Sequence, residues 1–536
     1  MSIIAYIKGM KKTKNGNTFL TGALILTAGG VLAKVLGAVY RIPLTNLLGS
    51  YAIGLYQLVF PLYTLLITVS MGFCVAVSRT IAREKRLHGC EDCGKILRCA
   101  LIALGGIGAA LSLALFLFAK PIATLQGNES IADGYRILSP AVLFVCLTGA
   151  LRGYFQGQMK MQPTAVSQVA EQLAKLVLGL TFAKIFLPDE VRAVNGAILA
   201  VTLSEIISLA VFGIYFAVDK KGQKKEIKTD GVMQSKEIYA TLFKAALPVT
   251  CAGVLAPLSQ LIDSALILKL LTGDATRLYG IWSGAVHSLF VMPVTLSAGI
   301  GAAILPDVSG NVAVGDMEGI NKKVNTAFKL NNVIVMPCVT GFLFLSAPIV
   351  KLLYGGLPQE DLFVAARLLS AVSVGTLVLC YSGTFNSVLQ GAGKEYVSLL
   401  FVTLSIVVRT VTNAILLQNQ KVGIFAIAFS TILCYLVSVI CSIVYLRKKV
   451  GIKLDLWSTF TKPLAACLAL VAVILSARLL AGGLLETSVG TLAVIGFGAV
   501  VYGVAVVALK VFEGLLPTIA KKLKHGGKKY AGTCTD

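Results

Sequence analysis

Five basic residues lie inside stretches that are otherwise apolar, where a charge is hard to accommodate: Lys34, Arg41, Arg152, Lys175 and Arg409. Ionisable groups at membrane depth are costly, and they usually face a partner or a water-filled cavity. Lysine and arginine hold phosphate-like anions through charge-assisted hydrogen bonds. The first chemistry that the sequence suggests is therefore the binding of an anion inside a membrane protein.

Most of these positions also have a simpler interpretation. Lys34 and Arg41 are seven residues apart and share a helix face, but Arg41 can instead reach the outer interface by snorkelling. Arg152 can equally lie at headgroup level at the end of a helix. Lys175 follows Glu171 by four residues, which is the spacing of a structural salt bridge.

Other polar side chains accompany the basic residues. Arg409 has no acidic residue within one helical turn, which favours a ligand or a cavity beside it. We expect supporting polar contacts from Gln156, Gln172 and Asn413. The acidic residues Glu171, Glu205 and Asp263 can bind a cation or a proton, or pair with lysines across the bundle, and the sequence leaves both alternatives open.

The segments that must position these residues are typical of membrane-spanning helices. Of the 536 residues, 56% are hydrophobic and only 14% are charged, and the mean hydropathy is +0.83. A soluble protein needs about 25% charged residues, so most of this surface must face lipid. Apolar runs of at least ~18 residues predict an all-α polytopic membrane protein with about fourteen transmembrane helices, near residues 18–40, 52–78, 99–119, 137–158, 163–184, 193–217, 241–268, 281–305, 327–350, 363–390, 396–417, 422–446, 460–481 and 488–512.

An internal repeat divides these helices into two groups of six. Gln156-Gly157-x-x-Lys160 recurs as Gln390-Gly391-x-x-Lys394. The same separation along the chain aligns Lys175 with Arg409. Shorter matches of 30–33 with 253–256 and of 70–72 with 297–299 follow in the same order. The predicted divisions are an N-terminal lobe over 1–217, a basic cytoplasmic linker over 218–240, a C-terminal lobe over 241–446, an extra helix pair over 447–512 and a basic cytoplasmic tail over 513–536.

Several classes of function are disfavoured. The net charge of +23 is spread over short runs between apolar segments, without the compact basic surface of a nucleic-acid binder. The chain carries no phosphate loop, no HExxH and no GxSxG with triad partners, so neither an enzyme nor a cofactor is predicted. The run from Thr18 to Tyr40 is too long for a signal-peptide core.

The segment HGCEDCGKILRC holds His88, Cys90, Cys93 and Cys99, which could ligate a metal ion. A second Cys/His pair at zinc spacing is absent. We therefore interpret these cysteines as reduced thiols on a cytoplasmic loop and predict no metal site.

Four segments resemble a known family: TFLTGALILTAGGVLAKVLGAVYRIPLTNLLG (18–49), LRGYFQGQMKMQPTAVSQVAEQLAKL (151–176), APLSQLIDSALI (256–267) and LQGAGK (389–394). They are similar to the polysaccharide-flippase branch of the MOP exporter superfamily, in particular the stage V sporulation protein B type, which is related to the MurJ lipid II flippase. The resemblance implies two six-helix lobes around a central cationic cavity. It also implies a groove for a lipid tail at the extra helix pair, and lipid-linked cell-wall precursors as substrates.

The resemblance carries over to single residues in span one. Lys34 and, approximately, Arg41 match a motif that holds two arginines in the MurJ relatives. Arginines that those relatives carry in spans two and eight are missing from PLYTLLITV and AVHSLFVMP. The expected pyrophosphate cavity is then formed by Lys34, Arg41, Arg152, Lys175 and Arg409.

The expected partners are a lipid-linked oligosaccharide of the undecaprenyl-pyrophosphate type, membrane lipids, and cell-wall synthesis or sporulation proteins in a bacterial plasma membrane. Alternative cargoes are capsule, teichoic or exopolysaccharide repeats on a lipid carrier. Two further alternatives are a multidrug exporter of the same superfamily and a membrane scaffold that does not transport.

Charge distribution gives a testable topology. With the N-terminus inside, 33 of the 48 Lys and Arg residues fall on cytoplasmic segments and 10 on outer loops, which places both termini in the cytoplasm. Cysteine or reporter tagging should find Lys224 and the tail after Lys521 inside, and positions near Asp189 and Gly356 outside. An external signal at Lys224 would contradict this topology.

Overall fold

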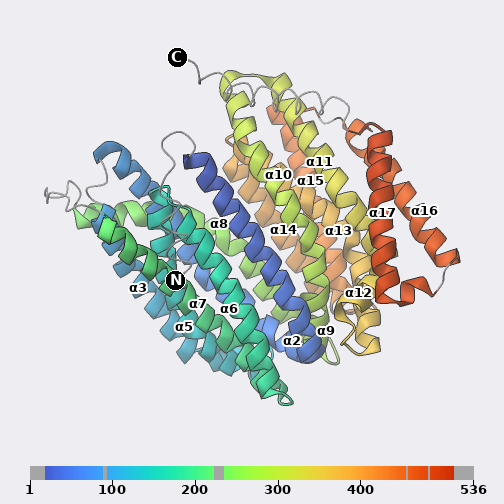
Figure 1. The fold of residues 1–536 in the computed structure, drawn as a ribbon, viewed down its shortest axis with the longest axis horizontal. Coiled ribbons are helices and arrows are strands. Elements are labelled where there is room, and N and C mark those ends of the chain that lie inside the picture. The colour runs from blue at the N-terminus through green and yellow to red at the C-terminus, as the bar shows by residue number, and fades with distance from the viewer. Residues whose placement is uncertain are drawn as a thin grey trace. The chain divides into compact units, whose positions relative to one another are not determined.

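The computed structural model describes residues 18–88, 93–222, 234–453, 455, 457–480 and 483–511. Within these ranges, every regular element is a helix (Figure 1). The chain divides into two compact units, Met1–Ala265 and Leu266–Asp536.

The first unit has a core where the second half of α2 meets α3, α5 and α7. Ile81, Ile96, Phe155 and Phe212 are fully buried there. The unit contains α2 (Thr18–His88), α3 (Cys93–Leu117), α4 (Ala119–Gln126), η1 (Glu129–Ile131), α5 (Ala132–Gly157), α6 (Gln162–Phe186), α7 (Glu190–Gly222) and most of α8 (Ser235–Leu270).

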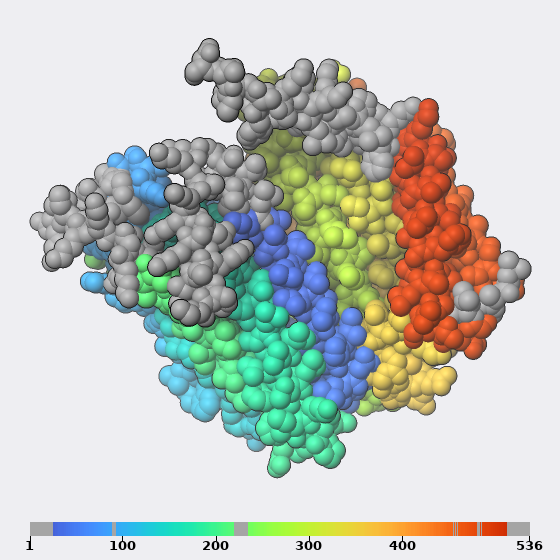
Figure 2. Space-filling model, in the orientation of Figure 1, coloured from blue at the N-terminus to red at the C-terminus, as the bar shows by residue number. Residues whose placement is uncertain are grey.

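The second unit repeats this plan and ends in a further helix pair. Figure 2 shows α16 and α17 side by side at its surface, in orange and red, and Tyr502 Oη of α17 donates a 3.0 Å hydrogen bond to the Val333 carbonyl of α11. The elements are α9 (Ala275–Gly280), η2 (Ile281–Val286), α10 (His287–Val314), α11 (Met317–Phe344), α12 (Ser346–Tyr354), α13 (Gln359–Gly391), α14 (Glu395–Leu416), α15 (Phe425–Tyr445), η3 (Leu446–Val450), η4 (Trp457–Thr461), α16 (Lys462–Leu480), η5 (Leu484–Glu486) and α17 (Ser488–Ala508).

Twelve helical stretches in the described residues are long and apolar enough to cross a membrane. The first of them holds two spans, because Gly49 interrupts α2 with a non-helical φ of 77° and ψ of 175°. Glycine has no Cβ and adopts this left-handed φ readily. The 25-residue α6 is long enough to cross as well, although it is more polar. The prediction of an all-α polytopic membrane protein with about fourteen spans is confirmed.

The internal repeat is visible in the backbone at the ends of α5 and α13. Met159 has a φ of 65°, and Gly393, the equivalent residue of the second copy, has a φ of 71°. The amide of Lys160 donates to the Phe155 carbonyl, and the amide of Lys394 donates to the Leu389 carbonyl, both at 2.9 Å. The same left-handed turn therefore ends the equivalent helix in each unit. The functional division into lobes and linker stays a prediction.

Two repeated glycines allow close helix packing in each unit. A Cβ at Gly157 would lie 2.8 Å from the Cβ of Ile81 on α2. A Cβ at Gly391 would lie 2.8 Å from the Leu305 carbonyl oxygen on α10. Small residues at such positions let membrane helices approach closely.

Alanine at either glycine should therefore destabilise the fold. We expect Gly157→Ala and Gly391→Ala each to lower the free energy of unfolding by about 1–3 kcal/mol, the usual cost of overpacking. Gly106→Ala is the matched control, because nothing lies within 4 Å of a Cβ there. Thermal unfolding of the purified protein in detergent measures the difference. Equal melting temperatures for all three variants would contradict the close-packing role.

Candidate functional site

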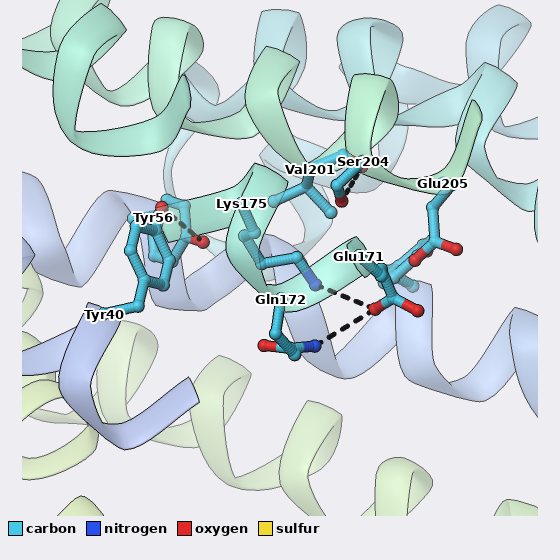
Figure 3. A network of polar contacts seen from close by, with 9 residues as sticks. Tyr40, Tyr56, Glu171, Gln172, Lys175, Val201, Ser204 and Glu205 are labelled. Carbon is cyan, nitrogen blue, oxygen red and sulfur yellow. Dashed lines mark hydrogen bonds and ion pairs between the residues drawn. The ribbon is translucent and has the colours of Figure 1, made fainter. Parts of the chain in front are cut away.

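Glu171, Gln172 and Lys175 of α6 form a compact polar network in the first unit (Figure 3). Glu171 Oε1 accepts a hydrogen bond from Gln172 Nε2 at 3.1 Å and lies 3.4 Å from Lys175 Nζ. The two charged side chains are 14% and 15% exposed. The salt bridge expected from their spacing is therefore present and nearly buried.

A second carboxylate faces this network from α7. Glu205 is 7% exposed, and its Oε1 accepts a 3.2 Å hydrogen bond from Tyr63 Oη on α2. Its carboxylate also interacts electrostatically with Glu171, Lys175 and Arg152. The cluster thus combines two acids and two bases from α5, α6 and α7, and its formal charges cancel.

Local sequence signals fix the helices that carry these groups. Pro163 occupies the first turn of α6, where its fixed φ suits a helix start. The side chain of Asp189 accepts a 3.0 Å hydrogen bond from the Arg192 amide at the start of α7. An anionic side chain is favourable at this end of a helix.

Arg152 and Gln156 lie one turn apart near the end of α5, and both are half-buried. Gln156 Oε1 lies 3.9 Å from Cys74 Sγ on α2. Within the part of the chain that the structure describes, Arg152 Nε has no hydrogen-bond partner although it is buried. Such a donor is costly unless something else satisfies it, so Arg152 is suited to meet a ligand or water.

The two basic residues of span one have different surroundings. Arg41 is half-buried, and its Nη2 donates a 3.0 Å hydrogen bond to Gln57 Oε1 within α2. Lys34 is exposed and forms no ion pair with any described residue. Gly37, which stands between them in the chain, lies close to Gln172 of α6, whose Oε1 would be 3.3 Å from a Cβ at that position.

The remaining candidates lie on α8 and α14. Asp263 of α8 is 4% exposed in the first unit. In the second unit, Arg409 is half-buried on α14, one turn before Asn413. Asn413 is fully buried, and its Oδ1 accepts a 2.5 Å hydrogen bond from Ser430 Oγ on α15. Asn413 therefore joins two helices of the second unit, which is a structural task.

The cysteine segment differs from expectation. Cys93 is disulfide-bonded, so the prediction of a reduced thiol is wrong at this position. A disulfide sulfur is no thiolate and cannot serve as a metal ligand. Cys99 is free and buried, whereas Cys90 and the side chain of His88 lie outside the described residues.

The network also contains residues that the sequence did not single out. Tyr40 and Tyr56 share a hydrogen bond of 3.3 Å, and Tyr63 reaches Glu205. Tyr56, Phe60 and Tyr63 are spaced i, i+4 and i+7, and their rings contact one another in sequence. The i, i+7 spacing of the two hydroxyl-bearing rings, Tyr56 and Tyr63, was an available signal for a polar face on span two.

The two units differ in chemistry at repeated positions. In the register that aligns Lys175 with Arg409, Ser405 stands in place of Glu171, and Val439 in place of Glu205. In the register that aligns 70–72 with 297–299, Phe290 stands in place of Tyr63. The Tyr63–Glu205 hydrogen bond is thus replaced by two apolar residues, while a basic residue persists as Arg409.

Comparison with known proteins agrees with this two-unit helical architecture. The family described as "Polysaccharide biosynthesis protein" matches residues 19–311, more than half of the chain. The chain belongs to the polysaccharide biosynthesis protein family. The MatE family matches residues 248–415.

Two curated relatives from Bacillus subtilis (strain 168) match most of the chain. "Lipid II flippase MurJ" is 26% identical over 456 residues, covering 81% of this chain and 83% of that protein. "Stage V sporulation protein B" is 25% identical over 439 residues, covering 77% and 81%.

Solved structures share the fold. "Lipid II flippase MurJ, inward closed conformation" has a TM-score of 0.71 at 16% identity and covers 92% of this chain and 100% of that one. An inward-facing multidrug resistance MATE family transporter of the MOP superfamily has a TM-score of 0.69 at 16% identity, covering 80% and 98%. The predicted resemblance to this family and to its relatives in the MOP superfamily is confirmed.

The salt bridge on α6 can be tested by comparing the removal of one charge with the removal of both. We expect Glu171→Leu to lower the free energy of unfolding by about 3 kcal/mol, because it leaves Lys175 charged and nearly buried. The double variant Glu171→Leu/Lys175→Leu should recover most of this loss, as measured by thermal unfolding in detergent.

The exposed pair Lys323–Asp307, whose side chains are 42% and 50% exposed, provides the control. Asp307→Leu should cost at most about 1 kcal/mol. A double α6 variant as unstable as Glu171→Leu alone would show that the two charges do not stabilise each other.

Proposed function

We propose that the protein is a flippase for a polyprenyl-pyrophosphate-linked cell-wall precursor, lipid II, which it moves from the inner to the outer leaflet by alternating access. The observation that carries this proposal is the basic residue retained at one repeat position of both units. Lys175 and Arg409 lie on equivalent helices, and neither side chain is fully exposed. In the second unit Ser405 stands in place of Glu171, so Arg409 lacks the acidic residue that pairs with Lys175. A purely structural salt bridge therefore does not explain why a basic residue is kept at this position.

A pyrophosphate is suited to such a set of cations. Arginine and lysine bind its oxygens by charge-assisted hydrogen bonds, which strengthen where water is excluded. In this proposal Lys34, Arg41, Arg152, Lys175 and Arg409 contribute to the substrate site, with Gln156 and Gln172 as supporting polar groups. Arg152 has the buried donor that a ligand oxygen would satisfy.

The energy for transport comes, in this proposal, from the membrane and its gradients, because the sequence has no phosphate loop for a nucleotide. The membrane potential supplies about 2.3 kcal/mol per charge per 100 mV. With both termini in the cytoplasm and the interior negative, it drives an anionic headgroup outward. Glu171, Glu205 and Asp263 are the candidates if a proton or cation is coupled.

A second cargo is favoured by the family description. Polysaccharide biosynthesis implies lipid-linked repeats, which carry the same pyrophosphate on a different sugar. A multidrug exporter is less compatible with a surplus of basic residues at membrane depth, and a scaffold does not need them. The relative named for sporulation supports a partner among cell-wall or sporulation proteins.

The test is complementation of bacterial cells depleted of their own lipid II flippases. The wild-type chain should restore lipid II in the outer leaflet. Lys34→Ala and Arg409→Ala should each reduce the rate at least about 30-fold, because truncating one partner of a charge pair that the bound pyrophosphate buries costs about 2–5 kcal/mol.

Lys421→Ala, on an exposed turn of the second unit, is the matched control and should retain activity. Expression and membrane insertion of every variant are checked by immunoblotting. Full activity of the Lys34→Ala/Arg409→Ala double variant would remove these cations from the substrate site. A well-expressed wild-type chain that fails to complement would reject lipid II as the cargo.

A further inference from the structure

An arginine on α13 of the second unit lies against two aromatic rings. Arg367 Cζ is 5.5 Å from the ring centre of Phe363, one turn earlier on the same helix. It is also 5.5 Å from the ring centre of Phe425, the first residue of α15. Both distances are within the ~6 Å at which a cation is attracted to the face of an aromatic ring. The two rings therefore hold the guanidinium of a side chain that is otherwise flexible.

The guanidinium of Arg367 keeps its hydrogen-bonding capacity. Arg367 is exposed, and it forms no hydrogen bond or ion pair with any residue that the structure describes. The acidic residues nearest to it along α13 are bound to Arg277 of α9 instead, whose Nη2 lies 3.3 Å from Glu360 Oε2 and 2.6 Å from Asp361 Oδ1. A guanidinium that stacks on aromatic rings can still bind a phosphate through its N–H groups in a bidentate manner.

The length of α15 places this guanidinium at one edge of the hydrocarbon layer. With 21 residues, α15 is about 32 Å long, close to the ~30 Å thickness of the hydrocarbon core. Its far end is followed by Arg447, Lys448 and Lys449, a basic run typical of the cytoplasmic headgroup region. Phe425 and the neighbouring Arg367 therefore lie at the opposite edge. The topology predicted from the charge distribution makes this the outer leaflet.

An apolar surface continues from this point toward the bilayer interior. Val374 lies two turns after Arg367 on α13 and is 45% exposed. Phe429 lies one turn after Phe425 on α15 and is 54% exposed. Each pair has the spacing of residues that share a helix face. A phospholipid has the complementary arrangement, a phosphate at headgroup depth followed by acyl chains.

We propose that Arg367 binds the phosphate of an outer-leaflet phospholipid, whose acyl chains lie against Val374 and Phe429. Phe363 and Phe425 are positioning residues, because they hold the guanidinium at the depth of the phosphate. The unpaired charge of Arg367 favours a headgroup with net negative charge. The proposal does not depend on the transported cargo, because none of these residues belongs to the proposed substrate site.

The test compares two lipids that have the same acyl chains and differ in the phosphate-containing headgroup. Dioleoylphosphatidylglycerol or dioleoylglycerol is added to the delipidated full chain in neutral detergent, and native mass spectrometry measures the dissociation constant of each. The wild type should bind dioleoylphosphatidylglycerol more tightly. Arg367→Gln should weaken this binding at least about 10-fold, because it removes hydrogen bonds between charged groups, and should leave the binding of dioleoylglycerol unchanged.

Lys421→Gln is the matched control. Lys421 is an exposed basic residue four positions before Phe425, so this variant loses the same charge at the same end of the unit. It should bind both lipids like the wild type. The double variant Phe363→Leu/Phe425→Leu keeps Arg367 but removes its rings, and it should weaken the binding of dioleoylphosphatidylglycerol several-fold. The melting temperature in lipid-free detergent checks that each variant is folded.

Four results would overturn the proposal. Equal binding of both lipids to the wild type would exclude a phosphate contact. Unchanged binding to Arg367→Gln would leave Arg367 as a structural contact between α13 and α15. An equal loss in Arg367→Gln and Lys421→Gln would show only a general effect of surface charge. Binding of undecaprenyl phosphate, but not of dioleoylphosphatidylglycerol, that depends on Arg367 would assign the site to a polyprenyl carrier. Wild-type binding by Phe363→Leu/Phe425→Leu would remove the positioning role of the rings.

Discussion

Charged side chains inside membrane-spanning helices must be paired, solvated or bound to a ligand, because hydrocarbon neither solvates a charge nor forms hydrogen bonds with it. The first unit meets this constraint by grouping its charges. Lys175 pairs with Glu171 at 3.4 Å, Glu205 accepts from Tyr63 at 3.2 Å, and Arg152 faces the same group from α5. The bends and close contacts of α2, α5, α6 and α7 bring these side chains together, so the packing of the unit and its polar cluster depend on one another.

The two units share a backbone plan but differ in how they handle charge. The left-handed turn after α5 is repeated after α13, with equivalent hydrogen bonds at equivalent positions of the repeat. Glu171 and Glu205 have become Ser405 and Val439, whereas the cation at Lys175 persists as Arg409. The two units therefore keep the same fold with different charges. The first unit carries a cluster of two acids and two bases, and the second carries Arg409 without the two acids. In the proposed flippase, the coupling candidates Glu171 and Glu205 therefore have no acidic counterpart in the second unit, whereas a basic residue stands at this repeat position in both units.

Local patterns in the sequence were sufficient for the helices and for contacts within one helix. Apolar runs indicated the spans, and the i,i+4 spacing indicated the Glu171–Lys175 pair. Contacts between distant segments could not be inferred, because they depend on how helices rotate and pack. Tyr63 and Glu205 are 142 residues apart, and Gln126 reaches Ser264 across 138 residues. The short helix α4 escaped prediction because eight residues are too few to span a membrane.

The central claim is that basic groups at membrane depth carry a lipid-linked pyrophosphate without nucleotide. Reconstitution of the purified chain in liposomes that contain labelled lipid II tests it most directly. The account predicts that lipid II transfer between leaflets accelerates when a membrane potential is imposed in the direction that drives the anionic headgroup, with no ATP present. Transfer no faster than in protein-free liposomes, for lipid II and for other lipid-linked glycans, under both a potential and an ion gradient, would contradict it.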